Sequence, residues 1–157
     1  MHIRPARADE AATLSDLAFR AKAHWGYSDA FMAACRDELT VAPQAVAAGG
    51  YQVVEDDAEV RAFYALCKVS PTAMELDALF VDPPFIGRGF GRALLQHAID
   101  ACAAAGMERL VIQADPQAAE FYQRCGALKI AERASDSIPG RMLPLYEIPI
   151  EAESTAR

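Results

Sequence analysis

Residues 74–105 limit most strongly what this chain can fold into. Apolar residues up to position 81 are followed by a Pro-Pro pair and by a loop with glycines at alternate positions of residues 87–91. Apolar residues at helical spacing then continue to residue 105. This order predicts a strand, a glycine loop and a helix. Such a loop leaves backbone N–H groups without partners at the helix N-terminus, where they can bind a phosphate.

The rest of the chain predicts an α/β (α+β) fold with a mixed, twisted sheet. Three strands joined by short polar turns precede the glycine loop and are typical of an antiparallel meander. The helix after the loop joins two strands that we expect to be parallel. The expected strands are 3–6, 51–55, 60–69, 74–81, 108–114, 128–134 and 143–150, and the expected helices are 9–22, 28–39, 89–105 and 116–125, with a helical turn at 43–48.

Length and composition indicate one domain over residues 1–150, followed by a polar tail at 151–157. The hydrophobic fraction of 53% is enough for a core. No apolar run approaches the roughly 20 residues that span a membrane, and the N-terminus lacks a secretory signal. A net charge of −7 argues against nucleic-acid binding. The cysteines stand far apart, which favours reduced thiols. We therefore expect a cytoplasmic protein with no metal, membrane or nucleic-acid partner.

The glycine loop matches neither of two common nucleotide-binding patterns. A Walker loop requires Lys followed by Ser or Thr after the last glycine, and the sequence has no such pair there. A dinucleotide fingerprint requires GxGxxG after the first strand of a βαβ unit, whereas these glycines come late in the chain and after a meander. A loop that binds acetyl-CoA is the third possibility.

The chain resembles the GCN5-related N-acetyltransferases (GNAT), whose pyrophosphate loop has the pattern Q/R-x-x-G-x-G/A. Residues 86–91, IGRGFG, match this pattern at Gly89 and Gly91. They differ at the first position, where Ile86 replaces Gln or Arg. Residues 114–122, ADPQAAEFY, are similar to the second cofactor segment of the family, in which a Phe-Tyr pair ends a short helix. The order of the elements also fits, so the resemblance covers nearly the whole chain.

The resemblance implies an N-acetyltransferase that moves acetyl from acetyl-CoA to a primary amine of a small molecule or peptide. It places pantetheine beside residues 79–81, where the parallel strands splay, and the pyrophosphate on the amides of residues 87–92. The residues that it assigns to the co-substrate are Leu79, Phe80, Val81, Ile86, Gly87, Arg88, Gly89, Phe90, Gly91, Arg92, Ala118 and Phe121.

Three residues are candidates for proton transfer. Tyr122 matches the tyrosine that protonates the departing thiolate in many family members, because a phenol stays protonated at neutral pH. The alternative is a tyrosine that packs at a helix end. Glu75 and Asp77 alternate on one strand, and either could accept the amine proton through a water. Their alternative is that they are solvated residues on a half-exposed strand.

Four further residues are candidates for binding the acceptor. His24, Trp25 and Tyr27 lie between the first two helices, where they could hold an amine by cation–π contact or fill a hydrophobic hinge. Arg141, in the late loop, could pair with a substrate carboxylate or with a surface acid. The sequence does not name the acceptor. A homodimer is possible, and two other functions stay open: an acyl-CoA sensor without turnover, or an acyltransferase with another acyl donor or a hydroxyl acceptor.

Overall fold

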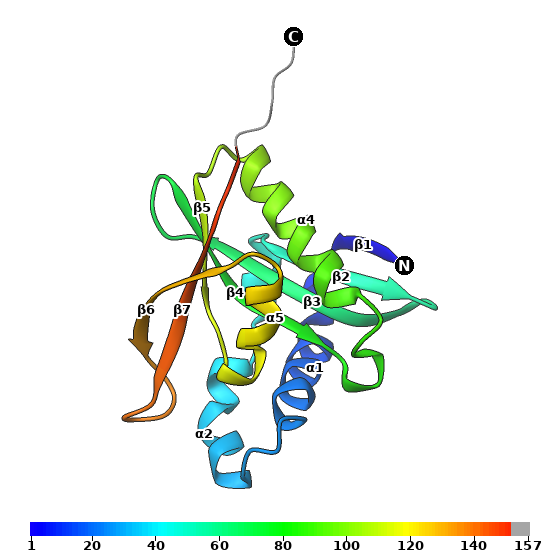
Figure 1. Cartoon of the computed structure of the whole chain (residues 1–157). Coiled ribbons are helices and arrows are strands. Elements are labelled where there is room, and N and C mark those ends of the chain that lie inside the picture. Colours follow the sequence, from blue (N-terminus) through cyan, green and yellow to red (C-terminus); the bar gives the residue numbers. More distant parts are fainter. Residues whose placement is uncertain (152–157) are drawn as a thin grey trace.

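A computed structural model describes residues 1–151 and contains a seven-stranded mixed sheet in the order β1-β2-β3-β4-β5-β7-β6 (Figure 1). Neighbouring strands are antiparallel except β4 and β5. The strands are β1 (His2–Pro5), β2 (Tyr51–Asp56), β3 (Glu59–Lys68), β4 (Ala73–Val81), β5 (Arg109–Gln113), β6 (Leu128–Ala134) and β7 (Met142–Pro149). The predicted fold class is therefore confirmed. All but the first residue of the predicted tail, 151–157, lies outside the described residues.

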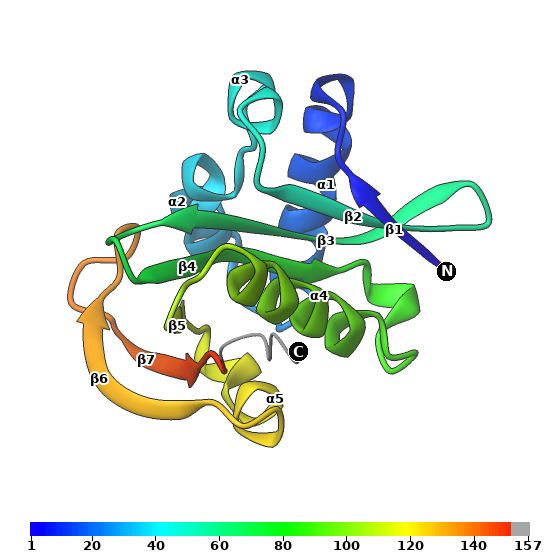
Figure 2. The same cartoon turned by 90° about the horizontal axis from the view of Figure 1, so that it is seen from above.

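Helices cover both faces of the sheet (Figure 2). The helices are α1 (Ala11–Ala23), α2 (Asp29–Leu39), α3 (Pro43–Ala47), α4 (Phe90–Ala104) and α5 (Ala119–Arg124). One apolar core lies between the sheet and α4 and α5, and a second lies between the sheet and α1 and α2. Among the described residues, no helix combines the length and apolar character needed to cross a bilayer.

Local sequence signals set the helix ends. The Ser28 hydroxyl accepts a hydrogen bond from Phe31 N at 3.1 Å and caps α2. Asp115 does the same for the turn before α5, where its Oδ1 accepts from Gln117 N at 2.8 Å. Gly106 follows α4 with a φ of +75°, the left-handed conformation that commonly ends a helix.

The parallel pair separates soon after it forms. β4 and β5 pair only from Ala73 to Glu75 on the β4 side. Beyond that point β4 continues along β3, while β5 continues along β7. On β4, Asp77 is an extra residue, because Ala65 faces Ala78 and the next residue of β3 already faces Leu76. Such a bulge bends and twists a strand, so it favours the opening of the sheet between β4 and β5.

Candidate co-substrate and acceptor site

The glycine loop presents a row of free backbone donors. Gly89 caps α4 with a φ of +84°, and the first bond of the helix joins Ala93 N to Gly89 O at 3.0 Å. In the described part of the chain, the N–H groups of residues 87–92 have no hydrogen-bond acceptor. They lie at the positive end of a helix of 15 residues. This arrangement suits the binding of an anion such as a pyrophosphate.

Residues from the two predicted co-substrate segments meet beside this loop. A methyl group on Gly91 would lie 3.5 Å from Phe121 Cζ and 3.6 Å from Val81 Cγ2. Leu79 and Val81 both pack on the α4–α5 side of the sheet, whereas Phe80 packs on the α1–α2 side. The fold therefore brings the end of β4, the start of α4 and α5 together at the opening between β4 and β5.

Two cationic side chains near the loop lie over the same aromatic ring. The guanidinium carbons of Arg88 and Arg61 lie 5.1 and 4.2 Å from the centre of the Phe85 ring. Arg61, on β3, was not identified from the sequence because it lies far from the loop along the chain. Its Nε is the one fully buried side-chain N or O atom without a partner in the described part of the chain. Ile86 is 47% exposed and supplies no charge.

A hollow of about 220 Å³ lies between α4 and α5. Its lining includes Arg92, which was predicted to bind the co-substrate. Its lining residues are Arg92, Leu95, Gln96, Ile99, Arg124 and Cys125. One of its two arginines, Arg124, pairs with Glu120.

Tyr122 is buried but keeps some contact with solvent. Its side chain packs in the α4–α5 core and is 6% exposed. Its hydroxyl forms no hydrogen bond with the described residues. The hydroxyl oxygen is therefore not fully buried, since Arg61 Nε is the one fully buried side-chain N or O atom without a partner in that part of the chain. Burial raises the pKa of Tyr122 above its ordinary value. The residue is therefore a protonated donor with an available hydroxyl. Ala118, at the preceding turn, packs against the same core.

Glu75 and Asp77 differ in their environments. Glu75 Oε2 accepts a hydrogen bond of 2.9 Å from Arg133, which reaches across from β6. Arg133 also donates to Gln113 Oε1 at 2.7 Å. Asp77 is exposed and forms no ion pair with the described residues. Burial, and then hydrogen bonding to Asp77 and its negative charge, raise the pKa of Cys67 to about 12. Asp77 is thus the less engaged of the two carboxylates.

The structure separates the aromatic residues of the α1–α2 junction. His24 and Trp25 are exposed, and their rings meet edge to face with centres 5.7 Å apart. Tyr27 instead turns inward and stacks on Phe31 with ring centres 4.1 Å apart. The three predicted residues therefore do not form one cluster.

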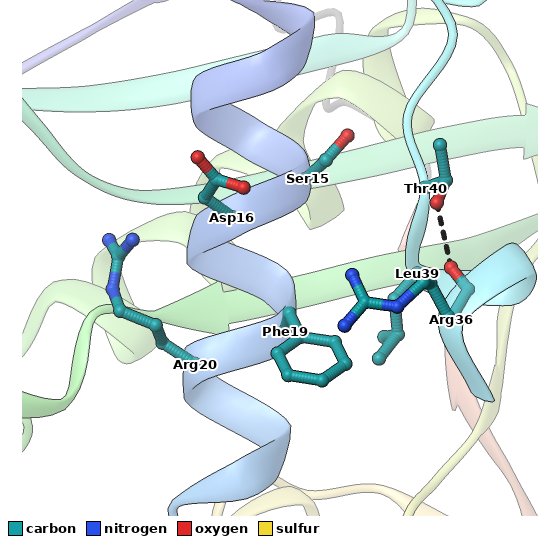
Figure 3. Close-up of a pocket in the computed structure, with 7 residues that line it drawn as sticks. All are labelled: Ser15, Asp16, Phe19, Arg20, Arg36, Leu39 and Thr40. Atoms are coloured by element: carbon teal, nitrogen blue, oxygen red, sulfur yellow. Dashed lines mark hydrogen bonds between the residues drawn. The ribbon is translucent and has the colours of Figure 1, made fainter. Parts of the chain in front are cut away.

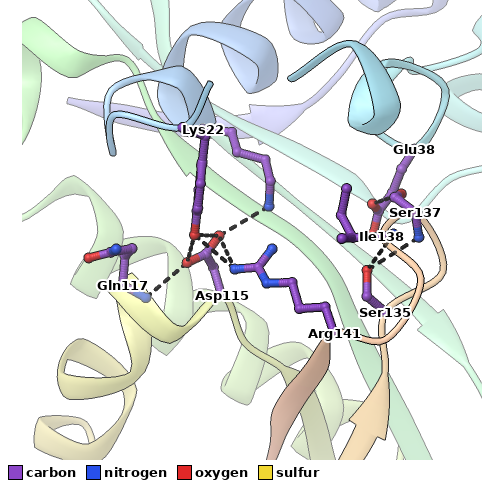
Figure 4. Close-up of polar contacts among 9 residues, drawn as sticks. Lys22, Glu38, Asp115, Gln117, Ser135, Ser137, Ile138 and Arg141 are labelled. Carbon is purple, nitrogen blue, oxygen red and sulfur yellow. Dashed lines mark hydrogen bonds and ion pairs between the residues drawn. The ribbon is translucent and has the colours of Figure 1, made fainter. Parts of the chain in front are cut away.

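Lys22, Asp115 and Arg141 form a charged network (Figure 4). Tyr27 belongs to the same network through its hydrogen bonds to Asp115 and Arg141. The Tyr27 hydroxyl donates to the Asp115 carboxylate, at 2.8 and 2.9 Å from its two oxygens, and accepts from Arg141 Nη2 at 2.8 Å. Lys22 Nζ lies 3.1 Å from Asp115 Oδ2. Burial alone would raise the pKa of Asp115, but the hydrogen bonds from Gln117 N, Tyr27 and Lys22 lower it. The network joins α1, the α1–α2 junction, the end of β5 and the β6–β7 loop.

A second hollow, also of about 220 Å³, lies between α1 and α2 (Figure 3). The Arg36 guanidinium stacks over Phe19 at 4.3 Å and forms one wall. The complete lining is Ser15, Asp16, Phe19, Arg20, Arg36, Leu39 and Thr40. None of these residues was predicted to bind the co-substrate or the acceptor.

The profile described as the acetyltransferase (GNAT) family matches residues 13–127. This chain belongs to the GNAT family. It is 34% identical over 77 residues to the peptidyl-lysine N-acetyltransferase YjaB of Salmonella typhimurium, a match that covers 49% of this chain and 51% of YjaB. The chain spans about half the length of the curated relatives it matches.

Solved structures of other GNAT proteins share the fold. The structure of a GCN5-related N-acetyltransferase from Rhodopseudomonas palustris has a TM-score of 0.77 and 20% identity, and the match covers 94% of each chain. The PaiA N-acetyltransferase of Thermoplasma acidophilum, solved with coenzyme A, has a TM-score of 0.74 and 16% identity, over 94% of this chain and 98% of PaiA. The likeness extends over almost the whole of this GNAT chain.

Besides Arg61, sequence reasoning missed two charged residues of this GNAT site, Lys22 and Arg133. Lys22 stands in an amphipathic helix, where a lysine is ordinarily solvated. Arg133 stands in an edge strand and reaches Glu75 across the sheet. Neither contact has a local pattern, because each joins residues that are distant in the sequence. Asp115 lies in the segment that resembles the second cofactor segment of the family, and its place in the charged network was not predicted.

Proposed function

We propose that this GNAT protein transfers an acetyl group from acetyl-CoA to a primary amine. The observation that supports this most is the row of free N–H groups at residues 87–92, beside the opening between β4 and β5. A pyrophosphate bound there would satisfy those donors. The binding of coenzyme A by PaiA, which shares the fold, agrees with this assignment.

We place the pantetheine arm in the opening between the two strands. Beyond Glu75, one edge of β4 has no strand partner among residues 1–151, so alternate N–H and C=O groups of residues 76–81 face the opening. An extended arm with amide groups can pair with such an edge as an added strand would. Leu79 and Val81 would contact it on the α4–α5 side.

Three steps then complete the transfer. Asp77 accepts a proton from the ammonium group through a water, which leaves a neutral amine. The amine attacks the thioester carbonyl, a C–N bond forms, and the C–S bond breaks. The nitrogen, positively charged after the attack, loses its second proton to water, while Tyr122 donates its own proton to the departing thiolate and regains one from solvent. The raised pKa of Tyr122 keeps it in the donor form at neutral pH.

Two acceptor classes are proposed, a peptide lysine and a small-molecule amine. YjaB is named a peptidyl-lysine N-acetyltransferase, which supports the first. The assay is thiol release from acetyl-CoA over a panel of lysine peptides, amino acids, polyamines and alcohols, with longer acyl-CoA donors in parallel. We expect release with amines. Tight acetyl-CoA binding without release for any acceptor would instead indicate a sensor, and release with alcohols alone would indicate a hydroxyl acceptor.

A further inference from the structure

Two cations in the charged network share one carboxylate. Lys22 Nζ and Arg141 Nη2 lie 3.1 and 3.8 Å from Asp115 Oδ2. The side chains of Lys22, Arg141 and Asp115 are only 15, 18 and 15% exposed. The nearby Tyr27 hydroxyl is neutral. The group therefore carries one excess positive charge in a largely buried place, where an uncompensated charge is unfavourable.

The excess charge is accompanied by unused donors. A guanidinium has five N–H donors in a planar fork, which matches a carboxylate. Within the described residues, the single hydrogen bond of the Arg141 side chain is the one to Tyr27, so its Nε and Nη1 have no acceptor. The Lys22 ammonium makes one hydrogen bond, to Asp115.

Aromatic rings and neighbouring bonds hold the two cations in place. The Arg141 guanidinium carbon lies 5.2 and 4.9 Å from the ring centres of Tyr27 and Phe31. Lys22 Nζ lies 5.6 and 5.8 Å from the same rings. The next carboxylate, Glu38, accepts a hydrogen bond from the Ser137 hydroxyl and pairs with neither cation. A preorganised guanidinium loses little entropy when it binds a ligand.

The network lies at the rim of the opening where the thioester would be placed. Asp115 comes shortly after β5, on the part of the chain that has parted from β4. Tyr27 and Phe31 pack on the α1–α2 side of the sheet, opposite the core that contains Tyr122. An acceptor that enters from the α1–α2 side would therefore pass these cations.

We propose that the acceptor carries a carboxylate near its amine and that Arg141, assisted by Lys22, binds this carboxylate. The substrate class is thus an amino acid, or a peptide with an acidic group close to the reacting amine. This inference rests on the proposed acetyl transfer and narrows it. Asp115 and Tyr27 act as positioning residues that hold the two cations toward the acceptor.

The test compares acceptors that differ only in the carboxylate. Glycine, β-alanine and longer ω-amino acids are each paired with their amides, and kcat/KM is measured with acetyl-CoA in excess. We expect at least one acid to exceed its amide tenfold or more. An amino amide is the weaker base and has more neutral amine at neutral pH, so intrinsic reactivity acts against this expectation.

Variants then assign the preference to the cations. Arg141→Gln is expected to lower kcat/KM for the preferred acid tenfold or more, mainly through KM, and to leave its amide and acetyl-CoA affinity unchanged. Arg141→Lys should restore part of the loss. Lys22→Met removes the second cation and keeps a buried hydrocarbon stem. It therefore tests the role of the cations in the acid preference independently of Arg141. Thermal melts confirm that each variant is folded.

Three results would overturn the inference, and they distinguish its failure from that of the proposed function. If amides are acetylated as well as acids, or if Arg141→Gln lowers both equally, acetyl transfer stands and the carboxylate assignment is wrong. If no amine in the panel is acetylated, the proposed function itself is wrong, and this inference with it.

Discussion

For individual residues, burial and partners decide which groups are available for chemistry. Tyr122 is buried, and its hydroxyl forms no hydrogen bond with residues 1–151, whereas Tyr146, also buried, accepts a hydrogen bond from Gln123 at 3.0 Å. Glu75 is held by Arg133, whereas Asp77 is exposed. These contrasts, rather than residue type, separate the candidates for catalysis from residues that stabilise the fold.

Tyr122→Phe should lower kcat about 100-fold or more, because the thiolate loses its proton donor. The affinity for acetyl-CoA, measured by calorimetry, should change little. Tyr146→Phe is the matched control, since it removes a buried hydroxyl that has a structural partner, and kcat should stay near the parent value. Full turnover in the Tyr122 variant would remove this residue from the mechanism.

Glu10 provides a test of stability against pH. Its hydrogen bonds from Arg4, opposed by burial, lower its pKa from 4.5 to about 2. A depressed carboxyl pKa stabilises the fold above the unfolded value and loses that effect as pH falls through the folded value. Glu10→Gln should therefore cost about 1–3 kcal/mol at pH 7. The difference from the parent should shrink between pH 4.5 and about 2, as urea melts at each pH would show. A difference that is independent of pH would contradict the ion pair.

At the scale of helices and strands, the local sequence predicts where helices end, but it does not predict strand register. Caps such as Ser28 and Gly106 predict helix ends correctly because their hydrogen bonds are local. The bulge at Asp77 was not predicted, because register depends on the partner strand. The bulge places Leu76 and Leu79 on the same face although they are three residues apart, which no strand period indicates.

A substitution at Gly89, at the start of α4, should weaken acetyl-CoA binding, and the same substitution at Gly106, just after the end of α4, is its control. Gly89 and Gly106 both have positive φ, and an added Cβ at either position would have no atom of the described residues within 4 Å, other than its chain neighbours and its own helix backbone. Leucine at each site should therefore cost a similar amount, about 1–2 kcal/mol. Only Gly89→Leu should weaken acetyl-CoA binding, by about tenfold or more, because its side chain would stand beside the free amides.

Calorimetry on the two glycine variants decides the outcome. Equal acetyl-CoA affinity in Gly89→Leu and Gly106→Leu would show that the loop does not hold the phosphates. A loss in both would indicate a general effect on α4 instead of a local one.

Across the whole molecule, the proposed co-substrate site and the proposed acceptor site lie on opposite faces of the sheet. The loop, α4, α5 and Tyr122 lie on one side, and the charged network lies toward the other. The sequence predicts the fold and the loop, since both depend on contiguous patterns. It does not predict the network, because Lys22, Asp115 and Arg141 come from distant parts of the chain. The homodimer and the roles of individual site residues remain predictions.

Thermal melting with and without ligand tests, for the whole domain, whether the pyrophosphate contributes to binding. A ligand at 100 times its Kd stabilises the folded state by about 2.7 kcal/mol, which for a domain of this size raises Tm by about 5–10 °C. Coenzyme A should produce a shift of this size. Pantetheine at the same concentration, which lacks the pyrophosphate, should produce a much smaller one. Equal shifts would show that the free amides contribute nothing to binding.

The most direct test is an amide-resolved NMR titration of the protein with acetyl-CoA. The proposed function predicts that the largest shifts and the strongest protection from hydrogen exchange appear at the N–H groups of residues 87–92, with smaller changes at residues 79–81. The amides at the C-terminal end of α4, near Gly106, should not respond. Saturating acetyl-CoA that leaves residues 87–92 unchanged would contradict the assignment of this loop as the pyrophosphate site.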